Sequence, residues 1–283
     1  MTLIYKGRET AVRIDKETAV RVTALREKGI APCLAVVRVG ERPDDMAYES
    51  GLMKRASELA VNVRRVLLPA DVRQDAVERV IDDLNADEAV HGILVFCPLP
   101  AHLNERAVCE RIAPDKDVDG TTAMSAAGVF LGKPIGYPPC TADAVVRILE
   151  DRQVPLRGRK VCVVGRSNVV GKPLSLMLIG KSATVTVCHS ATADLPAETL
   201  AADIIVSCAG RAGLIGRRHV RPGQVVIDVG INFDKDGRMC GDAAAEEIDG
   251  IVGAMTPVPG GVGSVTISVL MSHVAEAAGR KRL

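Results

Sequence analysis

Residues 159–192 read RKVCVVGRSNVVGKPLSLMLIGKSATVTVCHSAT, and they hold the pattern that decides the fold. The apolar run Lys160–Val164 ends at Gly165. A helix-like segment follows over Leu174–Ile179, and a second run rich in β-branched residues covers Ala183–Cys188. Two parallel strands need a crossover of about this size, and that crossover is usually a helix. The stretch therefore predicts the strand, glycine turn, helix and strand of a parallel sheet.

The turn at Gly165 has the chemistry of a phosphate-binding loop. Glycine lets the backbone approach a phosphate closely, because no Cβ stands in the way. The N-terminus of the following helix directs unpaired N–H groups and the positive end of its dipole at the same place. The spacing is Gly-x-Ser-x-x-x-Gly rather than Gly-x-Gly-x-x-Gly. It therefore also fits a turn that merely joins a strand to a helix, and a dinucleotide site is one of two hypotheses.

The composition argues against several other classes of function. Lys and Arg number 36 against 35 Asp and Glu, so no strong charge points to nucleic acid or a membrane surface. There is no Trp, and only three Phe and three Tyr could stack on bases. The eight cysteines include no Cys-x-x-Cys pair, which predicts a reducing compartment and no metal. Because the sequence has neither an apolar stretch long enough to span a membrane nor a signal-peptide pattern, we expect a cytoplasmic protein.

Helical and strand-like patterns alternate over the first part of the chain. The predicted strands are 32–40, 63–68 and 91–97, and the predicted helices are 7–28, 46–59, 75–85 and 104–112. Such alternation is typical of an α/β domain with a parallel sheet. The Gly/Pro-rich span 128–139 is the candidate boundary. We therefore expect one domain over 1–138, a Rossmann-type domain over 139–265, and a C-terminal helix within 266–283 that joins the first domain.

The predicted second domain repeats the pattern of a strand followed by a glycine. Ala202–Gly210 and Gly223–Gly230 are two further apolar runs of this kind. Ligands of such sheets bind at the carboxyl ends of the strands, so the repetition favours a cofactor site at Gly165 over a simple turn. The stretch TPVPGGVG at 256–263 follows. It suits a backbone that lines a pocket, although it also fits a rigid surface turn.

Eight short motifs lie along the chain in order. They are VG at 39–40 with Tyr48, GILV at 92–95 with PLP at 98–100, PDKDVDG at 114–120, PCT at 139–141, GRSNVVGKP at 165–173, CHS at 188–190, DVGIN at 228–232 and TPVPGGVG at 256–263. Together they resemble the bifunctional methylenetetrahydrofolate dehydrogenase/cyclohydrolase family over nearly the whole chain. The resemblance implies an N-terminal α/β substrate domain, a Rossmann domain, a folate cleft between them and a homodimer.

The resemblance also implies the residues of the site. It implies two residues that are both catalytic and substrate-binding: Tyr48, which packs on the folate, and Asp119, which binds the pterin. The further substrate-binding residues it implies are Pro259, Gly260 and Gly261. The cofactor-binding residues it implies are Gly165, Arg166, Ser167, Val170, Ser190, Ala209, Gly210 and Ile231. Arg166 and Ser190 end the first two Rossmann strands, where the adenosine ribose should lie. No acidic residue is there to hold a 2′-hydroxyl, and an Arg suits a 2′-phosphate, so NADP is favoured over NAD.

Three positions depart from the family pattern. The family carries Tyr-x-x-x-Lys on a helix, where a four-residue step of roughly 400° puts both side chains on one face. Here Leu52 stands at the lysine position, and Lys54 lies roughly 240° round the helix from Tyr48. The glutamine that pairs with this lysine is replaced by Phe96. A smaller departure is Ser264, which takes the place of a proline after Pro-Gly-Gly-Val-Gly.

These departures affect the two family reactions differently. Hydride transfer from a methylene between two nitrogens gives a cation that those nitrogens stabilise, so it needs mainly positioning. Hydrolysis of the methenyl cation needs attack by water and proton movement, for which a tuned lysine is the natural acid/base. We therefore predict NADP-dependent oxidation of 5,10-methylenetetrahydrofolate to 5,10-methenyltetrahydrofolate, with a weak or absent cyclohydrolase.

Three alternatives remain open. An ordinary bifunctional enzyme would need another residue, such as Lys54, to supply the lost group. A non-catalytic nucleotide-binding paralogue would have lost folate, although the presence of Tyr48 and Asp119 speaks against this, because drift would not spare the substrate residues selectively. An oxidoreductase acting on another substrate is the third alternative, since Leu52, Phe96 and Ser264 would all line one pocket.

Overall fold

The computed structural model describes residues 1–280, which form two compact units. One unit comprises Met1–Val12 and Thr141–Thr266, and the other comprises Arg13–Cys140 and the chain from Ile267 on. We call them the six-stranded unit and the three-stranded unit, after their main sheets. The first 12 residues group with the six-stranded unit, whereas sequence patterns alone place residues 1–138 together. The α/β class and the parallel sheets predicted from the sequence are confirmed.

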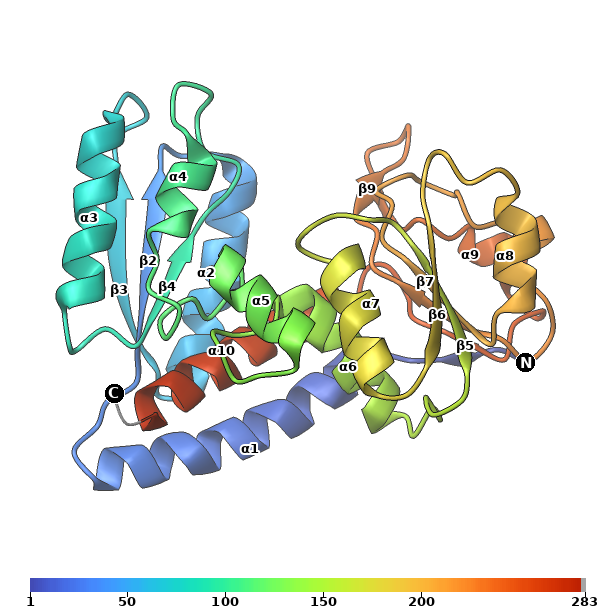
Figure 1. Cartoon of the computed structure of the whole chain (residues 1–283), viewed down its shortest axis with the longest axis horizontal. Helices are drawn as coiled ribbons and strands as arrows, with labels where there is room; N and C mark the ends of the chain where they lie inside the picture. Colours follow the sequence, from blue (N-terminus) through green and yellow to red (C-terminus); the bar gives the residue numbers. More distant parts are fainter. Residues whose placement is uncertain (281–283) are drawn as a thin grey trace. The chain divides into compact units, whose positions relative to one another are not determined.

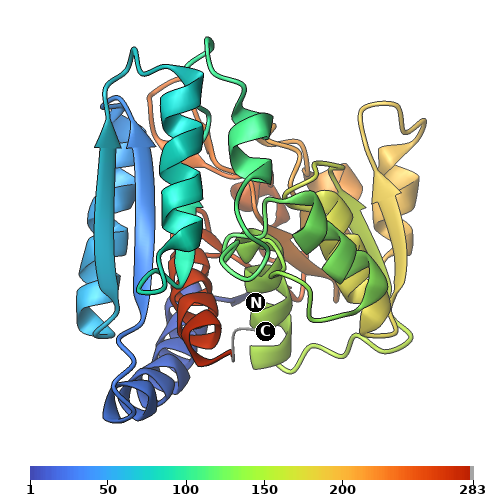
Figure 2. The ribbon, with the colours of Figure 1, turned by 60° about the vertical axis from the view of Figure 1, so that its left-hand side comes forward.

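The three-stranded unit is built on a parallel sheet with the order β3-β2-β4. Its strands are β2 (Cys33–Val39), β3 (Asn62–Leu68) and β4 (Gly92–Val95). Its helices are most of α1 (Gly7–Glu27) and α10 (Gly263–Gly279), together with α2 (Pro43–Glu58), α3 (Gln74–Ala86), α4 (Glu105–Glu110) and α5 (Ala123–Leu131). Figure 2 shows α2 and α3 on opposite sides of the strand pair β2 and β3.

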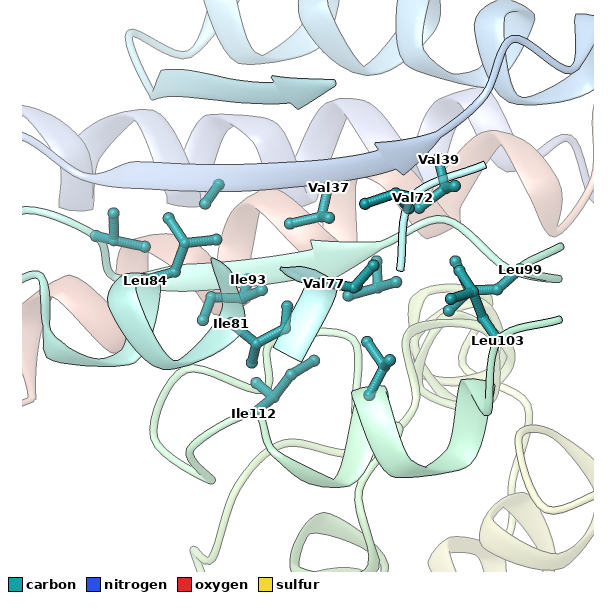
Figure 3. Packing of buried hydrophobic residues seen from close by; sticks show 14 residues of the cluster. Val37, Val39, Val72, Val77, Ile81, Leu84, Ile93, Leu99, Leu103 and Ile112 are labelled. Carbon is teal, nitrogen blue, oxygen red and sulfur yellow. The ribbon is translucent and has the colours of Figure 1, made fainter. Parts of the chain in front are cut away.

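The core of this unit follows from the alternation of β2. Val37 and Val39 point to one face, where Val77 and Ile81 of α3 reach them at helical spacing (Figure 3). Each large aliphatic side chain buried in this way contributes about 1.5–3 kcal/mol. The other face carries Arg38, which pairs with the buried Glu49 of α2. An ion pair therefore lies where α2 packs on the sheet.

The six-stranded unit contains a fully parallel sheet with the order β1-β11-β8-β7-β5-β6. The bounds are β1 (Leu3–Ile4), β5 (Lys160–Val164), β6 (Thr184–Cys188), β7 (Ile204–Ser207), β8 (Val225–Asp228) and β11 (Ala254–Met255). The four predicted strands form β5 to β8. Strands β1 and β11 were not predicted, because two residues show no periodicity and the pair Leu3↔Ala254 is distant in sequence.

The helices of this unit lie on both sides of its sheet, with α7 and α8 on opposite faces (Figure 1). They are α6 (Cys140–Asp151), α7 (Gly171–Gly180), α8 (Leu195–Ala201), α9 (Ala245–Ile248) and the 3₁₀ turn η1 (Arg217–His219). A small hairpin pairs β9 (Asn232–Phe233) with β10 (Met239–Cys240). The strand order reverses at β5, because β6 lies on one side of it and β7 on the other. Ligands of such sheets bind at this switch point.

Helices α8 and α9 were not predicted from the sequence, and α5 and α10 also differ from the prediction. Helix α5 begins after Thr122, whose hydroxyl accepts from the Ser125 N–H at 3.2 Å, and it continues into the Gly/Pro-rich span 128–139 that was expected to be the domain boundary. Helix α10 starts at Gly263, three residues before the predicted 266. The end of the predicted segment, 281–283, lies outside the described residues. Within residues 1–280, no helix is long and apolar enough to cross a membrane.

Candidate functional site

The turn after β5 is shaped by two glycines. Gly165 has φ +137°, and a Cβ there would lie 2.5 Å from the Cys208 carbonyl oxygen. A Cβ on Gly171 would collide with the carbonyl of Gly165. The Ser167 hydroxyl accepts from the Val170 N–H at 3.1 Å, and α7 begins at Gly171. The turn therefore brings the N-terminus of a ten-residue helix to the carboxyl end of β5, which is the geometry of an anion site.

Arg166 and Ser190 lie just after the carboxyl ends of two adjacent strands, β5 and β6. The Gly165 N–H donates to the Cys188 carbonyl at 2.9 Å, so the ends of β5 and β6 lie side by side. Both Arg166 and Ser190 are exposed. Within residues 1–280, Arg166 makes no ion pair. A guanidinium in this position can bind a phosphate ester, because Arg presents several N–H donors in a planar fork.

The loops after β7 and β8 carry the remaining predicted cofactor residues. Gly210 has φ +64°, and Ile231 keeps 63% of its surface exposed. Two buried carboxylates hold these loops, and neither was predicted from the sequence. Asp242 accepts from the N–H groups of Ala209 and Gly210. Asp228 accepts from the Gly230 N–H at 2.9 Å, and burial raises its pKa to about 6.

The segment Pro259–Gly261 packs on the start of α1. Gly260 has φ +96°, and its carbonyl accepts from the Gly7 N–H at 2.9 Å. Ser264 donates its hydroxyl to the Gly261 carbonyl at 2.7 Å. The hydroxyl that stands in place of the expected proline therefore fixes the entry into α10. In this way the glycine-rich stretch forms ordered backbone within the six-stranded unit.

The predicted substrate residues of the three-stranded unit meet at the carboxyl ends of its strands. The rings of Tyr48 and Phe96 contact edge to face, with centroids 5.8 Å apart and planes at 79°. Tyr48 is 37% exposed, whereas Leu52 is 0% and Phe96 6% exposed. Tyr48 is thus partly exposed, whereas Leu52 and Phe96 are packed inside. The two replaced positions supply no acid or base.

Asp119 lies directly after the buried residues 116–118. Its pKa is raised to about 6, mainly by burial and also by the nearby Asp117, while the Cys140 thiol and His273 oppose the rise. Burial also raises the pKa of Tyr48, and the charges of Asp119 and Cys140 add to this effect. Tyr48, Asp119 and Cys140 therefore lie close enough to influence each other. A carboxylate and a partly exposed aromatic ring close together suit a flat heterocycle with N–H donors.

Lys54 does not join these residues. It is exposed, whereas Leu52, two positions earlier on α2, is fully buried. A step of two residues turns the helix by roughly 200°, so the two side chains point to different sides. Lys54 therefore lies away from the face that carries Leu52.

The sequence prediction missed one buried ion network beside Phe96. Arg38 donates to Glu49 at 3.0 Å, and Arg65 of β3 also pairs with Glu49. The Phe96 N–H donates to the Val37 carbonyl at 3.0 Å, so Arg38 comes next to Phe96 across the strand pair. A charged residue inside the apolar run of β2 was the signal. Among the described residues, no cluster of three or more His, Cys, Asp or Glu could hold a metal ion.

Two family models match this chain. The model of the tetrahydrofolate dehydrogenase/cyclohydrolase NAD(P)-binding domain covers residues 139–282, and that of the catalytic domain covers residues 5–119. The chain belongs to the tetrahydrofolate dehydrogenase/cyclohydrolase family. The resemblance seen in the sequence motifs is thereby confirmed.

Relatives in this tetrahydrofolate dehydrogenase/cyclohydrolase family match end to end. The bifunctional protein FolD of Carboxydothermus hydrogenoformans is 46% identical over 273 residues, which are 96% of this chain and 95% of the relative. The crystal structure of FolD from Campylobacter jejuni is 35% identical with a TM-score of 0.96, over 99% of both chains. The Trypanosoma brucei enzyme, in complex with NADP cofactor and an inhibitor, is 36% identical with a TM-score of 0.91, over 98% of this chain and 97% of that one.

Proposed function

We propose that this protein is an NADP-dependent 5,10-methylenetetrahydrofolate dehydrogenase whose cyclohydrolase activity is weak or absent. The full-length family match supports the dehydrogenase reaction. The products are 5,10-methenyltetrahydrofolate and NADPH, because the hydride leaves the methylene carbon for the nicotinamide. The two units correspond to the folate and cofactor domains in this proposal, with the boundary near residue 139.

The role of the three-stranded unit in this reaction is to bind and orient the folate. Tyr48 offers the ring face on which the pterin packs, and Asp119 accepts hydrogen bonds from pterin N–H groups. Neither residue has to move a proton, because the nitrogens that flank the methylene carry the charge of the product. Positioning alone can supply several kcal/mol of the barrier reduction, on the order of 7–11 in the most favourable cases.

The single observation that carries the proposed loss of cyclohydrolase is the burial of Leu52. It is 0% exposed, with Phe96 at 6% in the position of the glutamine. An apolar pair in this place can neither activate a water nor protonate the leaving nitrogen. Arg38 cannot replace them, because a guanidinium stays protonated at any accessible pH and this one pairs with Glu49. Lys54 is exposed and faces elsewhere.

NADP as the cofactor is supported by Arg166 and Ser190 at the ends of β5 and β6. Arg166 can pair with the 2′-phosphate, and the Gly165 turn with the helix N-terminus of α7 suits the pyrophosphate. The family relative from Trypanosoma brucei carries NADP in its crystal structure. When bound, the cofactor accepts the hydride, and the chain's own residues supply only its placement.

A homodimer in the cytoplasm completes the proposal. Strand β6 is the edge of the six-stranded sheet, and its sequence TVTVC has no charge that would block pairing with another strand. Val187 on β6 and Ile179 on the neighbouring α7 are 39% and 55% exposed. Light scattering coupled to gel filtration tests this part of the proposal, and a monomer at micromolar concentration would contradict it.

The second candidate function is an ordinary bifunctional dehydrogenase/cyclohydrolase. The family relative from Carboxydothermus hydrogenoformans favours it, since it is described as bifunctional. The discriminating experiment follows the methenyl product after addition of methylenetetrahydrofolate and NADP. Accumulation of the methenyl form at the rate of NADPH formation supports our proposal. Conversion to formyltetrahydrofolate faster than the uncatalysed reaction would favour the bifunctional alternative.

A further inference from the structure

Asp242 is a buried carboxylate that five donors surround. It has 0% exposure and follows the hairpin β9–β10. Its Oδ2 accepts from the Ser207 hydroxyl at 3.0 Å, the Ala209 N–H at 2.7 Å and the Gly210 N–H at 3.2 Å. Its Oδ1 accepts from the Arg211 N–H at 2.8 Å and the Asn232 side-chain amide at 3.0 Å. Both oxygens are thus fully engaged.

Three of these donors are consecutive backbone N–H groups. Ala209, Gly210 and Arg211 turn around one anion, and Gly210 has the positive φ of +64° that such a turn needs. Successive N–H groups in this arrangement form a concave anion site called a nest. In many proteins a nest binds a phosphate. Here the protein fills the nest with its own carboxylate, so these N–H groups are not available to the pyrophosphate of a cofactor.

Asp242 also fixes the second loop of the proposed cofactor site. Asn232 directly follows the exposed Ile231, and its amide reaches the same carboxylate. A Cβ on Gly230 would lie 2.6 Å from the Asp242 backbone nitrogen, so only glycine lets the loops approach. Asp228 in turn accepts from the Asp242 N–H at 3.0 Å and the Ala243 N–H at 2.8 Å.

We propose that Asp242 is a positioning residue that orders two cofactor-contacting loops, the one at Ala209–Arg211 and the one at Ile231–Asn232. The inference rests on the proposed function, because that function makes these loops part of the NADP site. Because Asp242 is 0% exposed, it acts through these loops rather than on the cofactor directly. It sets the backbone path before the cofactor arrives, so binding costs less ordering of the loops.

The first test variant is Asp242→Asn, which keeps the size of the side chain. One carboxylate oxygen becomes an NH₂ donor. This NH₂ then faces either the donors that bind Oδ2 or the donors that bind Oδ1, and it can accept a hydrogen bond from neither. Loss of a hydrogen bond to the charged carboxylate leaves the loops less ordered before NADP binds. We therefore expect the Kd for NADP to rise by about tenfold to a hundredfold. Gln224→Met is the matched control. Gln224 is also 0% exposed and hydrogen-bonded by both ends of its side chain, but it precedes β8 at the opposite end of the sheet.

Calorimetric titration with NADP alone and hydrogen exchange of the Ala209–Arg211 amides supply the readouts. We expect Asp242→Asn to weaken NADP binding and lose amide protection, while Gln224→Met lowers Tm and leaves Kd within about twofold. Equal loss of Tm in both variants with Kd unchanged in both would overturn the positioning role. Absence of NADP binding to the unmodified protein would overturn the proposed function, and with it this inference.

A second variant covers the case that Asp242→Asn does not fold. Asn232→Leu removes one of the five donors and leaves the nest in place. We expect a folded protein with a raised Kd for NADP and an unchanged KM for the folate. An unchanged Kd in this variant would also overturn the proposal.

Discussion

Placing the family's lysine and glutamine at positions 52 and 96 should raise the cyclohydrolase activity, which we propose to be weak or absent. The variant Leu52→Lys/Phe96→Gln places an amine and an amide at the two positions that are 0% and 6% exposed in this protein. Burial of the lysine among apolar neighbours depresses its pKa toward the range in which it can donate and accept protons. General acid–base catalysis contributes about 10²–10⁴-fold, so we expect the cyclohydrolase rate to rise by at least about a hundredfold.

The same burial sets the cost of the change. A single Leu52→Lys leaves an ammonium without a partner in a packed site, which costs about 3–5 kcal/mol of unfolding free energy. For a chain of this size each kcal/mol lowers Tm by roughly 2–4 °C. The single variant should therefore unfold roughly 10 °C lower. Phe96→Gln supplies an acceptor for the ammonium, so the double variant should recover part of that loss.

The assay follows decay of the methenyl absorbance, with two controls. Leu52→Met repacks the helix face without adding an amine and should leave the cyclohydrolase rate unchanged. Lys54→Met removes the exposed lysine of α2 and should change neither reaction. A double variant that folds, retains dehydrogenase activity and still shows no hydrolysis would refute the reasoning, because the missing lysine would then not be the cause.

Three further predictions follow from other parts of the structure. Arg166→Ala should raise KM for NADP by about tenfold or more and leave KM for NAD within about twofold, since only NADP carries the 2′-phosphate. Equal effects on both cofactors would contradict the role of this exposed residue. The pKa of Asp119 is about 6, so folate affinity should rise as pH increases through 6 and its carboxylate ionises. Initial rates at subsaturating folate should be about a tenth of maximal at pH 5, and Asp119→Asn should lack this ionisation. Glu49→Gln leaves Arg38 buried at 3% exposure and should lower unfolding free energy by about 3–5 kcal/mol in denaturant titrations, whereas exposed Glu58→Gln should change it by about 0.5 or less.

The strands that form the sheets could be predicted because buried parallel strands are continuous apolar runs. Lys160–Val164 and Ala202–Gly210 show this plainly, since each ends at a glycine turn. Helix α5 was missed because its C-terminal half enters a Gly/Pro-rich span, and only the capping contact of Thr122 reveals its start. Strand β1 was missed because its partner β11 is some 250 residues away in sequence, as the Thr2 hydroxyl bonded to the Val252 carbonyl shows.

The candidate site was predicted only in part. Tyr48 and Phe96 came from motif positions, and the structure adds that their rings touch. Asp228 stood in the DVGIN motif without a role, and Asp242 gave no sequence signal beyond a Gly-Asp step after a hairpin, because their partners are backbone N–H groups of distant loops. Such hydrogen-bond networks form only when loops that are distant in sequence come together in the fold, so no local sequence pattern predicts them.

We propose that this chain oxidises methylenetetrahydrofolate and hydrolyses the methenyl product weakly or not at all. Purified protein should be mixed with methylenetetrahydrofolate and NADP, with a parallel reaction in NAD, while NADPH and the methenyl absorbance are recorded together. We predict equal amounts of both products with NADP, slower turnover with NAD, and a methenyl signal that decays no faster than in buffer. A methenyl signal that disappears in proportion to protein concentration would contradict the account.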